Sequence, residues 1–313
     1  MSRFFLKFVA PATLLLGASG CSHEATAPTV LEGVAADERN AVQAIFAQAK
    51  VDAGHVVAHD DLYGFSWRGG ETYAAQHGRP DRAEAIRKRR DDVRDAIAVE
   101  DGHVVALRLS GSKLSDVSLV SKLTHLVVLD LHDSQIGNAN GLSALAHLDH
   151  LDLAGNRLDS LAEISGLPML RSLNVAGNPL DTIDGLDALP RLEVLNLANS
   201  HISKIEHLDK LGALQALSLA ENPIERIEGL EQNGNLDDLN LSYCRITRIE
   251  NLSALKKLRS LNLWHNKISK IAGVEEVTSL LYLGLGENPY EWDDPRNREL
   301  LPSFGAGRLI TVM

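Results

Sequence analysis

The chain has 313 residues and a formal net charge of −11, and it is 44% hydrophobic but only 4% aromatic. This length suits two ordinary domains, or one elongated repeat domain with an appendage. The charge argues against general affinity for nucleic acid, which needs a cationic surface to displace counterions. The low aromatic content indicates an aliphatic core, and the only two cysteines, Cys21 and Cys244, exclude a small disulfide-framed domain.

Residues 1–20 have the features of a targeting segment. Arg3 and Lys7 supply positive charge, residues 8–16 are apolar, and residues 17–20 are small. The apolar run is too short to span a bilayer as a mature helix. Removal of the segment takes away two cations and no acid, so the net charge of the mature chain becomes −11 − 2 = −13.

The residues at the end of this segment, Ala18-Ser19-Gly20-Cys21, resemble the lipobox of bacterial lipoproteins. The resemblance implies that Cys21 is lipidated, for example with palmitate, and becomes the mature N-terminus. Several acyl chains would anchor a globular body firmly to a membrane. Ser22 follows the cysteine, which by the same resemblance favours the outer membrane if the source has two. The alternative is a secretory signal with an incidental cysteine.

Two segments separate the targeting signal from the rest of the chain. Residues 21–34 have little hydrophobic content and indicate a short tether. Residues 35–103 are expected to form a helical N-terminal cap. Its first helix spans 35 to about 51, where Val42, Ile45, Phe46 and Val51 have helical spacing, and its second helix spans 80 to about 98.

A strict period of 22 residues begins at Val104 and continues without insertion or deletion through eight full turns and a partial ninth. The template is L-x-x-L-x-L-x-x-N-x-I-x-x-I-x-x-L-x-x-L-x-x. Its first positions are Val104, Leu126, Leu148, Leu170, Leu192, Leu214, Leu236, Leu258 and Leu280. Alternation at positions four to six predicts one short strand per repeat in a parallel sheet.

The ninth position of the repeat predicts a ladder of polar side chains at the inward turn. An asparagine amide can satisfy otherwise buried backbone groups of the neighbouring turn. Serine or cysteine replaces asparagine in some repeats, so Cys244 is interpreted as a buried ladder residue, not as a nucleophile or metal ligand. The asparagines are Asn156, Asn178, Asn222, Asn266 and Asn288, and the substitutes are Ser112, Ser134, Ser200 and Cys244.

The 22-residue template, with isoleucine at positions eleven and fourteen, resembles the phosphatase-regulator-like and internalin-like class of leucine-rich repeats. The resemblance covers residues 104–290 and implies an α/β fold. It implies a right-handed solenoid with a concave parallel sheet, short 3₁₀ turns on the convex side and a protein-binding role. The open ends of a solenoid need covering, so residues 35–103 and 291–313 are expected to be caps, with Trp292 plugging the second and Leu300, Leu301 and Leu309 closing the last turn.

The solvent side of the predicted sheet contains an aromatic cluster toward its C-terminal end. Tyrosine and tryptophan dominate interface hot spots, so this cluster is the predicted partner-binding site. The alternative is that the rings pack under the C-terminal cap. The predicted site residues are Asp238, Asn240, Tyr243, Asn262, Trp264, His265 and Tyr282.

Toward the N-terminal end, Asp130, His132, His150 and Asp152 form a quadrilateral on two adjacent strands. Two imidazoles and two carboxylates suit zinc, but a solvated polar surface with one His–Asp hydrogen bond is the preferred interpretation. A second metal candidate, His55 and His59, lacks the Glu of a metalloprotease motif.

Other charged features have simple explanations. The basic run at 87–90 lies among acidic residues, which indicates a mixed-charge helix face. A basic column (Lys204, Arg226, Arg248 and Lys270) runs beside an acidic one (Glu206, Glu228 and Glu250), which indicates mutual neutralisation.

The sequence thus predicts a monomeric, lipid-anchored envelope protein that binds a protein partner, without enzymatic activity, cofactor or nucleic acid. Three alternatives stay open. They are recognition of a glycan or peptidoglycan fragment by the same aromatic residues, a metal-dependent enzyme using the His/Asp quadrilateral, and a structural spacer in the envelope.

Overall fold

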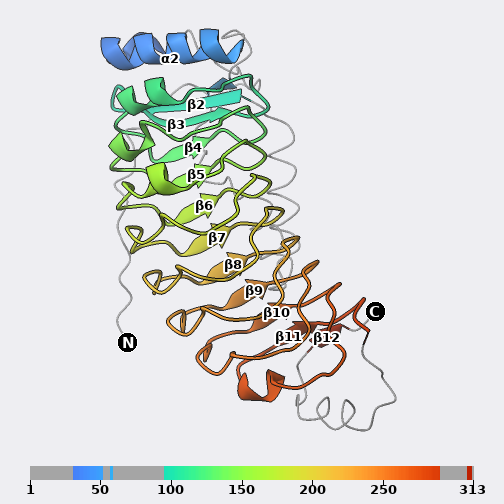
Figure 1. The fold of residues 1–313 in the computed structure, drawn as a ribbon. Coiled ribbons are helices and arrows are strands. Elements are labelled where there is room, and N and C mark those ends of the chain that lie inside the picture. The colour runs from blue at the N-terminus through green and yellow to red at the C-terminus, as the bar shows by residue number, and fades with distance from the viewer. Residues whose placement is uncertain (1–30, 52–56, 59–94, 290–308, 312–313) are drawn as a thin grey trace, which may run out of the picture.

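A computed structural model describes residues 31–51, 57–58, 95–289 and 309–311 of the chain. Within these ranges the strands form a single twelve-stranded sheet in which sequence order and spatial order are the same. Figure 1 shows the strands stacked along a bent solenoid, with α2 lying across its N-terminal end.

The N-terminal end consists of η1 (Leu31–Gly33), α2 (Ala36–Ala49), β1 (Val57–Ala58) and β2 (Asp95–Glu100). The repeat strands follow as β3 (His103–Leu109), β4 (Val128–Asp130), β5 (His150–Asp152), β6 (Ser172–Asn174), β7 (Val194–Asn196), β8 (Ala216–Ser218), β9 (Asp238–Asn240), β10 (Ser260–Asn262) and β11 (Tyr282–Gly284). The last described strand is β12 (Leu309–Thr311), and short 3₁₀ turns are η4 (Ser118–Lys122), η5 (Leu142–Ala144), η6 (Ala162–Ile164) and η7 (Val274–Glu276).

The sheet is parallel from β3 to β12, and from β3 to β11 paired residues are 22 positions apart. Leu129, for example, pairs with Leu107 on one side and Leu151 on the other. The leucines and isoleucines of the template are buried in one continuous core. The predicted strand in each repeat is therefore confirmed. Side chains alternate along a strand, so the leucines at positions four and six both point into the core.

The predicted asparagine ladder is present. The Nδ2 atom of Asn178 donates to the carbonyls of Leu153 and Val175 at 2.9 and 2.8 Å, and its Oδ1 atom accepts the N–H of Leu158 at 2.9 Å. Asn156, Asn222, Asn266 and Asn288 repeat this pattern. Each amide thus joins two consecutive turns of the solenoid.

Cys244 occupies a ladder position, as predicted. Its Sγ atom lies 3.4 Å from the carbonyl oxygen of Leu219, one repeat earlier. Burial raises the pKa of the thiol to about 11, although backbone N–H groups of Asn222 and Ile224 oppose the shift. The side chain is therefore a neutral thiol at physiological pH, as a structural role requires.

The N-terminal cap begins earlier than the expected boundary at residue 35. Leu31 and Val34 are buried in the main core, so these residues do not belong to a tether. The predicted first helix is confirmed as α2, which buries Val42, Ile45 and Phe46 against the first repeats.

The predicted second helix is wrong at its C-terminal end. Residues 95–98 belong to β2, which pairs antiparallel with β3 and contains a register shift between Ala98 and Val99. Ala96 and Ile97 are fully buried there, so pairing with the first repeat decides the conformation of this segment. Residues 80–94 lie outside the described part of the chain.

The C-terminal end adds β12, which pairs with β11 and extends the parallel sheet beyond the repeats. The sequence predicted that Leu309 closes the last turn, but it did not predict this strand. Trp292, Leu300 and Leu301 lie outside the described residues. No helix in the described part of the chain has the length and apolar character needed to cross a membrane.

Candidate functional site

The solvent side of the sheet, here the sheet face, consists of the side chains at positions three, five and seven of each repeat. Its fifth position has a structural role, because the side-chain oxygen accepts the backbone N–H two residues ahead. The acceptors are Asp130, Asp152, Asn174, Asn196, Asn240 and Asn262. These side chains fix the turn that ends each strand.

The middle of the sheet face is small and neutral. The seventh position is alanine in four consecutive repeats, and the fifth position there is asparagine or serine in all but the first of them, which has Asp152. The alanines are Ala154, Ala176, Ala198 and Ala220. This part of the surface is flat and has few large or charged side chains that could make strong contacts with a partner.

Large rings gather at the C-terminal end of the sheet face and on the turns beside it, and we call Tyr243, Trp264, His265 and Tyr282 the aromatic patch. Tyr243 is 51% exposed, and its ring stacks on His265 with centroids 4.7 Å apart. The sequence placed all four rings on strands, but only Tyr282 lies on one. The other three occupy the turns that follow β9 and β10.

Trp264 and Tyr282 meet above Gly284. A Cβ atom at Gly284 would lie 2.9 Å from the Tyr282 hydroxyl and 3.1 Å from Cδ1 of Trp264. Asn262 approaches the same point and accepts the backbone N–H of Trp264 at 3.1 Å. Glycine therefore makes room for both rings, and Asn262 acts as a positioning residue for Trp264.

Tyr243 and His265 occupy a backbone conformation that disfavours them. The eighth position of the repeat has positive φ throughout, at Gly111, Asp133, Gly155, Gly177, Asn199, Glu221, Tyr243, His265 and Glu287. Within this column the φ angle is 57° at Tyr243 and 52° at His265. A bulky residue in this left-handed region costs on the order of 1 kcal/mol, which glycine or asparagine largely avoids.

The polar members of the predicted site have local structural roles. Asp238 is only 7% exposed, so it is a buried residue of β9 and not a surface contact. Asn240 accepts both the N–H and the hydroxyl of Ser242, which commits its Oδ1 atom to the local turn. Of the seven predicted residues, Tyr243 and His265 are exposed, Asp238 is buried, and the other four are half-buried.

The N-terminal end of the sheet face contains the predicted His–Asp hydrogen bond, but within a polar network whose acid is buried. The Nε atom of Arg108 lies 2.6 Å from Asp130 Oδ2, and the Nδ1 atom of His132 lies 2.6 Å from Asp130 Oδ1. Arg108 and Asp130 are both buried. Burial favours the neutral acid, but His132 and Arg108 outweigh it and lower the pKa of Asp130.

The pKa of Asp152 is shifted in the opposite direction. Burial and the neighbouring Asp130 carboxylate raise its pKa to about 7, against the N–H of Ala154, the His132 ring and the amide of Asn174. Burial also favours the neutral form of His132, but Asp130, Asp152 and Asp133 raise its pKa. The pKa values of two carboxyls in neighbouring repeats are therefore shifted in opposite directions.

The predicted quadrilateral does not form, because His150 turns to Asp149, with its Nδ1 atom 2.8 Å from Asp149 Oδ2. The other three residues do bring ligand atoms within 4.8 Å of one another. The buried Arg108 guanidinium already neutralises Asp130, which opposes a second cation at the same place. His55 and His59 lie outside the described residues.

Comparison with known proteins agrees with this geometry. Two family models described as leucine-rich repeats match residues 124–180 and 234–288. The matched stretches are leucine-rich repeats, and the strands from β3 to β11 keep the same 22-residue register between and beside them. No curated protein matches the chain.

Solved structures share this leucine-rich-repeat fold. An internalin of Listeria monocytogenes is 25% identical with a TM-score of 0.56, over 61% of this chain and 59% of the internalin. A leucine-rich-repeat protein of Leptospira interrogans is 22% identical with a TM-score of 0.53, over 70% of this chain and 61% of its own. One chain of a TLR13–ssRNA13 complex is 27% identical with a TM-score of 0.56, over 62% of this chain and 30% of its own.

These similarities define the architecture. The chain spans about three fifths of the internalin, so that protein's whole activity does not transfer with the fold. Leucine-rich-repeat proteins are in general binding modules without enzymatic activity, and their usual partners are proteins. The choice of partner is a property of side chains at particular repeats.

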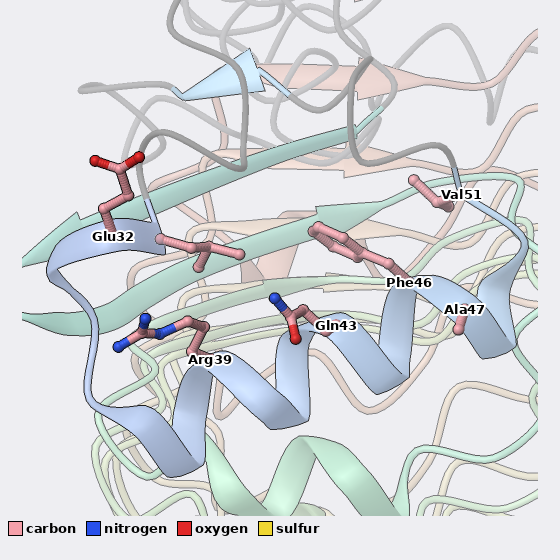
Figure 2. Close-up of a pocket in the computed structure, with 7 residues that line it drawn as sticks. Glu32, Arg39, Gln43, Phe46, Ala47 and Val51 are labelled. Carbon is pink, nitrogen blue, oxygen red and sulfur yellow. The ribbon is translucent and has the colours of Figure 1, made fainter.

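The N-terminal cap contains a pocket of about 450 Å³ on the side of α2 (Figure 2). Its lining is largely apolar, with Glu32, Arg39 and Gln43 at one side and Phe46 and Val51 at the other. The Nη2 atom of Arg39 donates to the carbonyl of Val34 at 2.9 Å. This arginine thus helps to fix the start of α2.

The predicted charge columns on the outer side of the repeats are confirmed in part. Arg226 lies 3.0 Å from Glu250 and 4.0 Å from Glu228. The Arg226 side chain is 63% exposed, so these pairs contribute little to stability.

Proposed function

We propose that the chain is a non-enzymatic binding protein that captures a protein partner at the aromatic patch. The observation that carries this proposal is the placement of Tyr243 and His265. Both are bulky residues in a left-handed backbone conformation, and Tyr243 is half exposed. Strain of this kind persists where the side chain contributes something that glycine or asparagine would not.

The chemistry of the patch suits a protein surface. Stacked and adjoining rings present a large, rigid contact area with few rotatable bonds. The flat alanine stretch beside it permits close approach of a partner backbone. The net charge of −11 disfavours the alternative that the partner is a nucleic acid.

A glycan or peptidoglycan fragment is the second candidate for the same surface, because aromatic faces also pack against sugar rings. Soluble glycan fragments would then compete with the captured partner for the aromatic patch. Failure of such fragments to compete favours the protein partner.

The proposal places the protein at a bacterial envelope through a lipid on Cys21, with the outer membrane favoured if two are present. The support is the lipobox-like sequence at 18–21 and the serine that follows it. Cells grown with labelled palmitate should incorporate the label into the unmodified chain and not into the Cys21→Ser variant. Equal incorporation into both chains would contradict a lipid anchor at Cys21.

Replacement of Tyr243 and His265 by asparagine tests the binding surface. Asn199 already occupies the eighth position of its repeat at φ 53°, so the double variant Y243N/H265N keeps a residue that suits the backbone. We expect at least a tenfold loss of partner recovery from envelope extracts, roughly 1.4 kcal/mol or more of binding free energy. The melting temperature should stay unchanged or rise.

Asp133→Asn is the matched control, because it makes the same kind of change at the eighth position near the other end of the solenoid. It should leave partner recovery as it is in the unmodified chain. Equal recovery by Y243N/H265N and the unmodified chain would contradict the proposed surface.

A further inference from the structure

Glu38 on α2 is a buried carboxylate that points at the first repeats. Its side chain is 4% exposed. The Oε2 atom accepts the backbone N–H of Val104 at 2.9 Å, and the Oε1 atom faces two imidazoles. The carboxylate therefore joins the cap to the first repeat through both of its oxygens.

The two imidazoles belong to His103 and His125, which occupy the same position in consecutive repeats. Their Nδ1 atoms lie 3.0 and 3.1 Å from Glu38 Oε1. The rings stack with centroids 3.6 Å apart and an angle of 23° between their planes. Two nitrogens thus converge on a single oxygen from the same side.

The charge balance around Glu38 suits a cation. The carboxylate is buried, and its oxygens face the N–H of Val104 and the rings of His103 and His125. Among the described residues, the groups that form ion pairs with Glu38 are these two histidines. A cation held between the carboxylate and the two imidazole nitrogens would balance the negative charge of Glu38.

The ligand atoms of the three side chains lie within 4.8 Å of one another. Tetrahedral zinc binds imidazole nitrogen and carboxylate oxygen at about 2.0–2.2 Å, so neighbouring ligands lie roughly 3.4 Å apart. The observed nitrogen–oxygen separations are a few tenths of an ångström shorter. To hold the ion, the two stacked rings would separate and turn so that both Nδ1 atoms point at it.

The site is also reachable from solvent. The side chains of His103 and His125 are 36% and 46% exposed, while Glu38 is buried beneath them. A metal ion would enter from the imidazole side and keep a water molecule as its fourth ligand. This donor set of two nitrogens and one oxygen suits zinc better than magnesium or calcium, which prefer oxygen.

We propose that Glu38, His103 and His125 form a zinc-binding site that fastens the N-terminal cap to the first two repeats. The ion would replace the protons shared between each Nδ1 atom and Glu38 Oε1. It would cross-link residue 38 to positions 65 and 87 residues further along the chain. Such a link stabilises the folded state by the free energy of metal binding.

Zinc titration of the purified chain tests this site. We expect one zinc ion per chain by isothermal titration calorimetry and a rise in melting temperature on adding zinc, with no rise on adding magnesium. The variant H103Q/H125Q should bind zinc at least about tenfold more weakly and lose the zinc-dependent rise. Both histidines are partly exposed, so this variant retains the core of the cap.

His147→Gln is the matched control, because it is the next histidine of the same column and its ring lies 6.4 Å from that of His125. It should bind zinc like the unmodified chain. Zinc binding that is unchanged in H103Q/H125Q, or a chain that binds no zinc, would overturn the proposal. If H103Q/H125Q fails to fold, the Glu38→Gln variant must show the same loss of zinc binding for the proposal to stand.

Discussion

Asp130 and Asp152 occupy the fifth position in neighbouring repeats and accept the same kind of backbone hydrogen bond. Their surroundings nevertheless separate them. Asp130 lies against Arg108 and His132, whereas Asp152 lies against Asp130 and the amide of Asn174. The first carboxylate is stabilised in its charged form, and the second in its neutral form.

Asp152→Asn should therefore stabilise the protein in a pH-dependent way. Below about pH 4 both the folded and the unfolded chain hold the Asp152 proton. Between pH 4 and 7 only the unfolded chain releases it, so the folded state loses stability as pH rises, and above pH 7 the loss is constant. The stabilisation by Asp152→Asn should grow across this window toward an upper limit of roughly 4 kcal/mol.

Asp130→Asn is the contrasting variant. It leaves the buried Arg108 guanidinium without this counter-charge and should destabilise the fold by about 3 kcal/mol at neutral pH. Urea denaturation at pH 4 and pH 8 measures both changes. Equal effects of the two substitutions at pH 8 would contradict the opposite pKa shifts of the two carboxyls, because asparagine suits the fifth position in both repeats.

At the scale of the element, each turn of the solenoid is held to the next by one ladder side chain. Asn178 satisfies two carbonyls and one N–H in buried surroundings. Loss of these bonds leaves backbone groups without partners in a core that water does not reach.

Asn178→Ala should lower the free energy of unfolding by about 3 kcal/mol, because three buried backbone groups lose their hydrogen bonds. Asn138→Ala, at an exposed turn where Asn138 accepts only the N–H of Asn140, should change it by less than about 0.5 kcal/mol. Thermal unfolding of the two variants distinguishes them, and similar melting temperatures would argue against the ladder as a main source of cohesion.

The repeat elements were predictable from sequence because their contacts recur every 22 residues. The leucine positions and the ladder, including Cys244, follow from that period alone. The conformation of 95–98 was not predictable in this way, since burial of Ala96 and Ile97 against β3 decides it.

The candidate sites were predictable to different degrees. The aromatic residues were visible in the sequence, but the positive φ of the eighth position was hidden by its varied residue types. Gly155 and Gly177 in that column were the available signal. The Glu38 cluster was not found, because Glu38 meets His103 and His125 only once the cap folds onto the repeats.

At the scale of the whole molecule, the solenoid has two different ends. The N-terminal end combines α2, the Glu38 cluster and the buried Arg108–Asp130 pair, all of which fix structure. The middle of the sheet face is small and neutral, and the C-terminal end presents the aromatic patch. Under the proposed function, a partner is expected to contact the later repeats, away from the fixed contacts of the N-terminal end.

Site-specific photocrosslinking in the native envelope tests this account most directly. A photoreactive residue at Glu287, next to His265 in the eighth-position column, is compared with one at Asp133 near the other end. The account predicts a discrete protein adduct from position 287, lost in Y243N/H265N, and little or none from position 133. Adducts from position 133 alone, or an adduct from position 287 that survives Y243N/H265N, would contradict it.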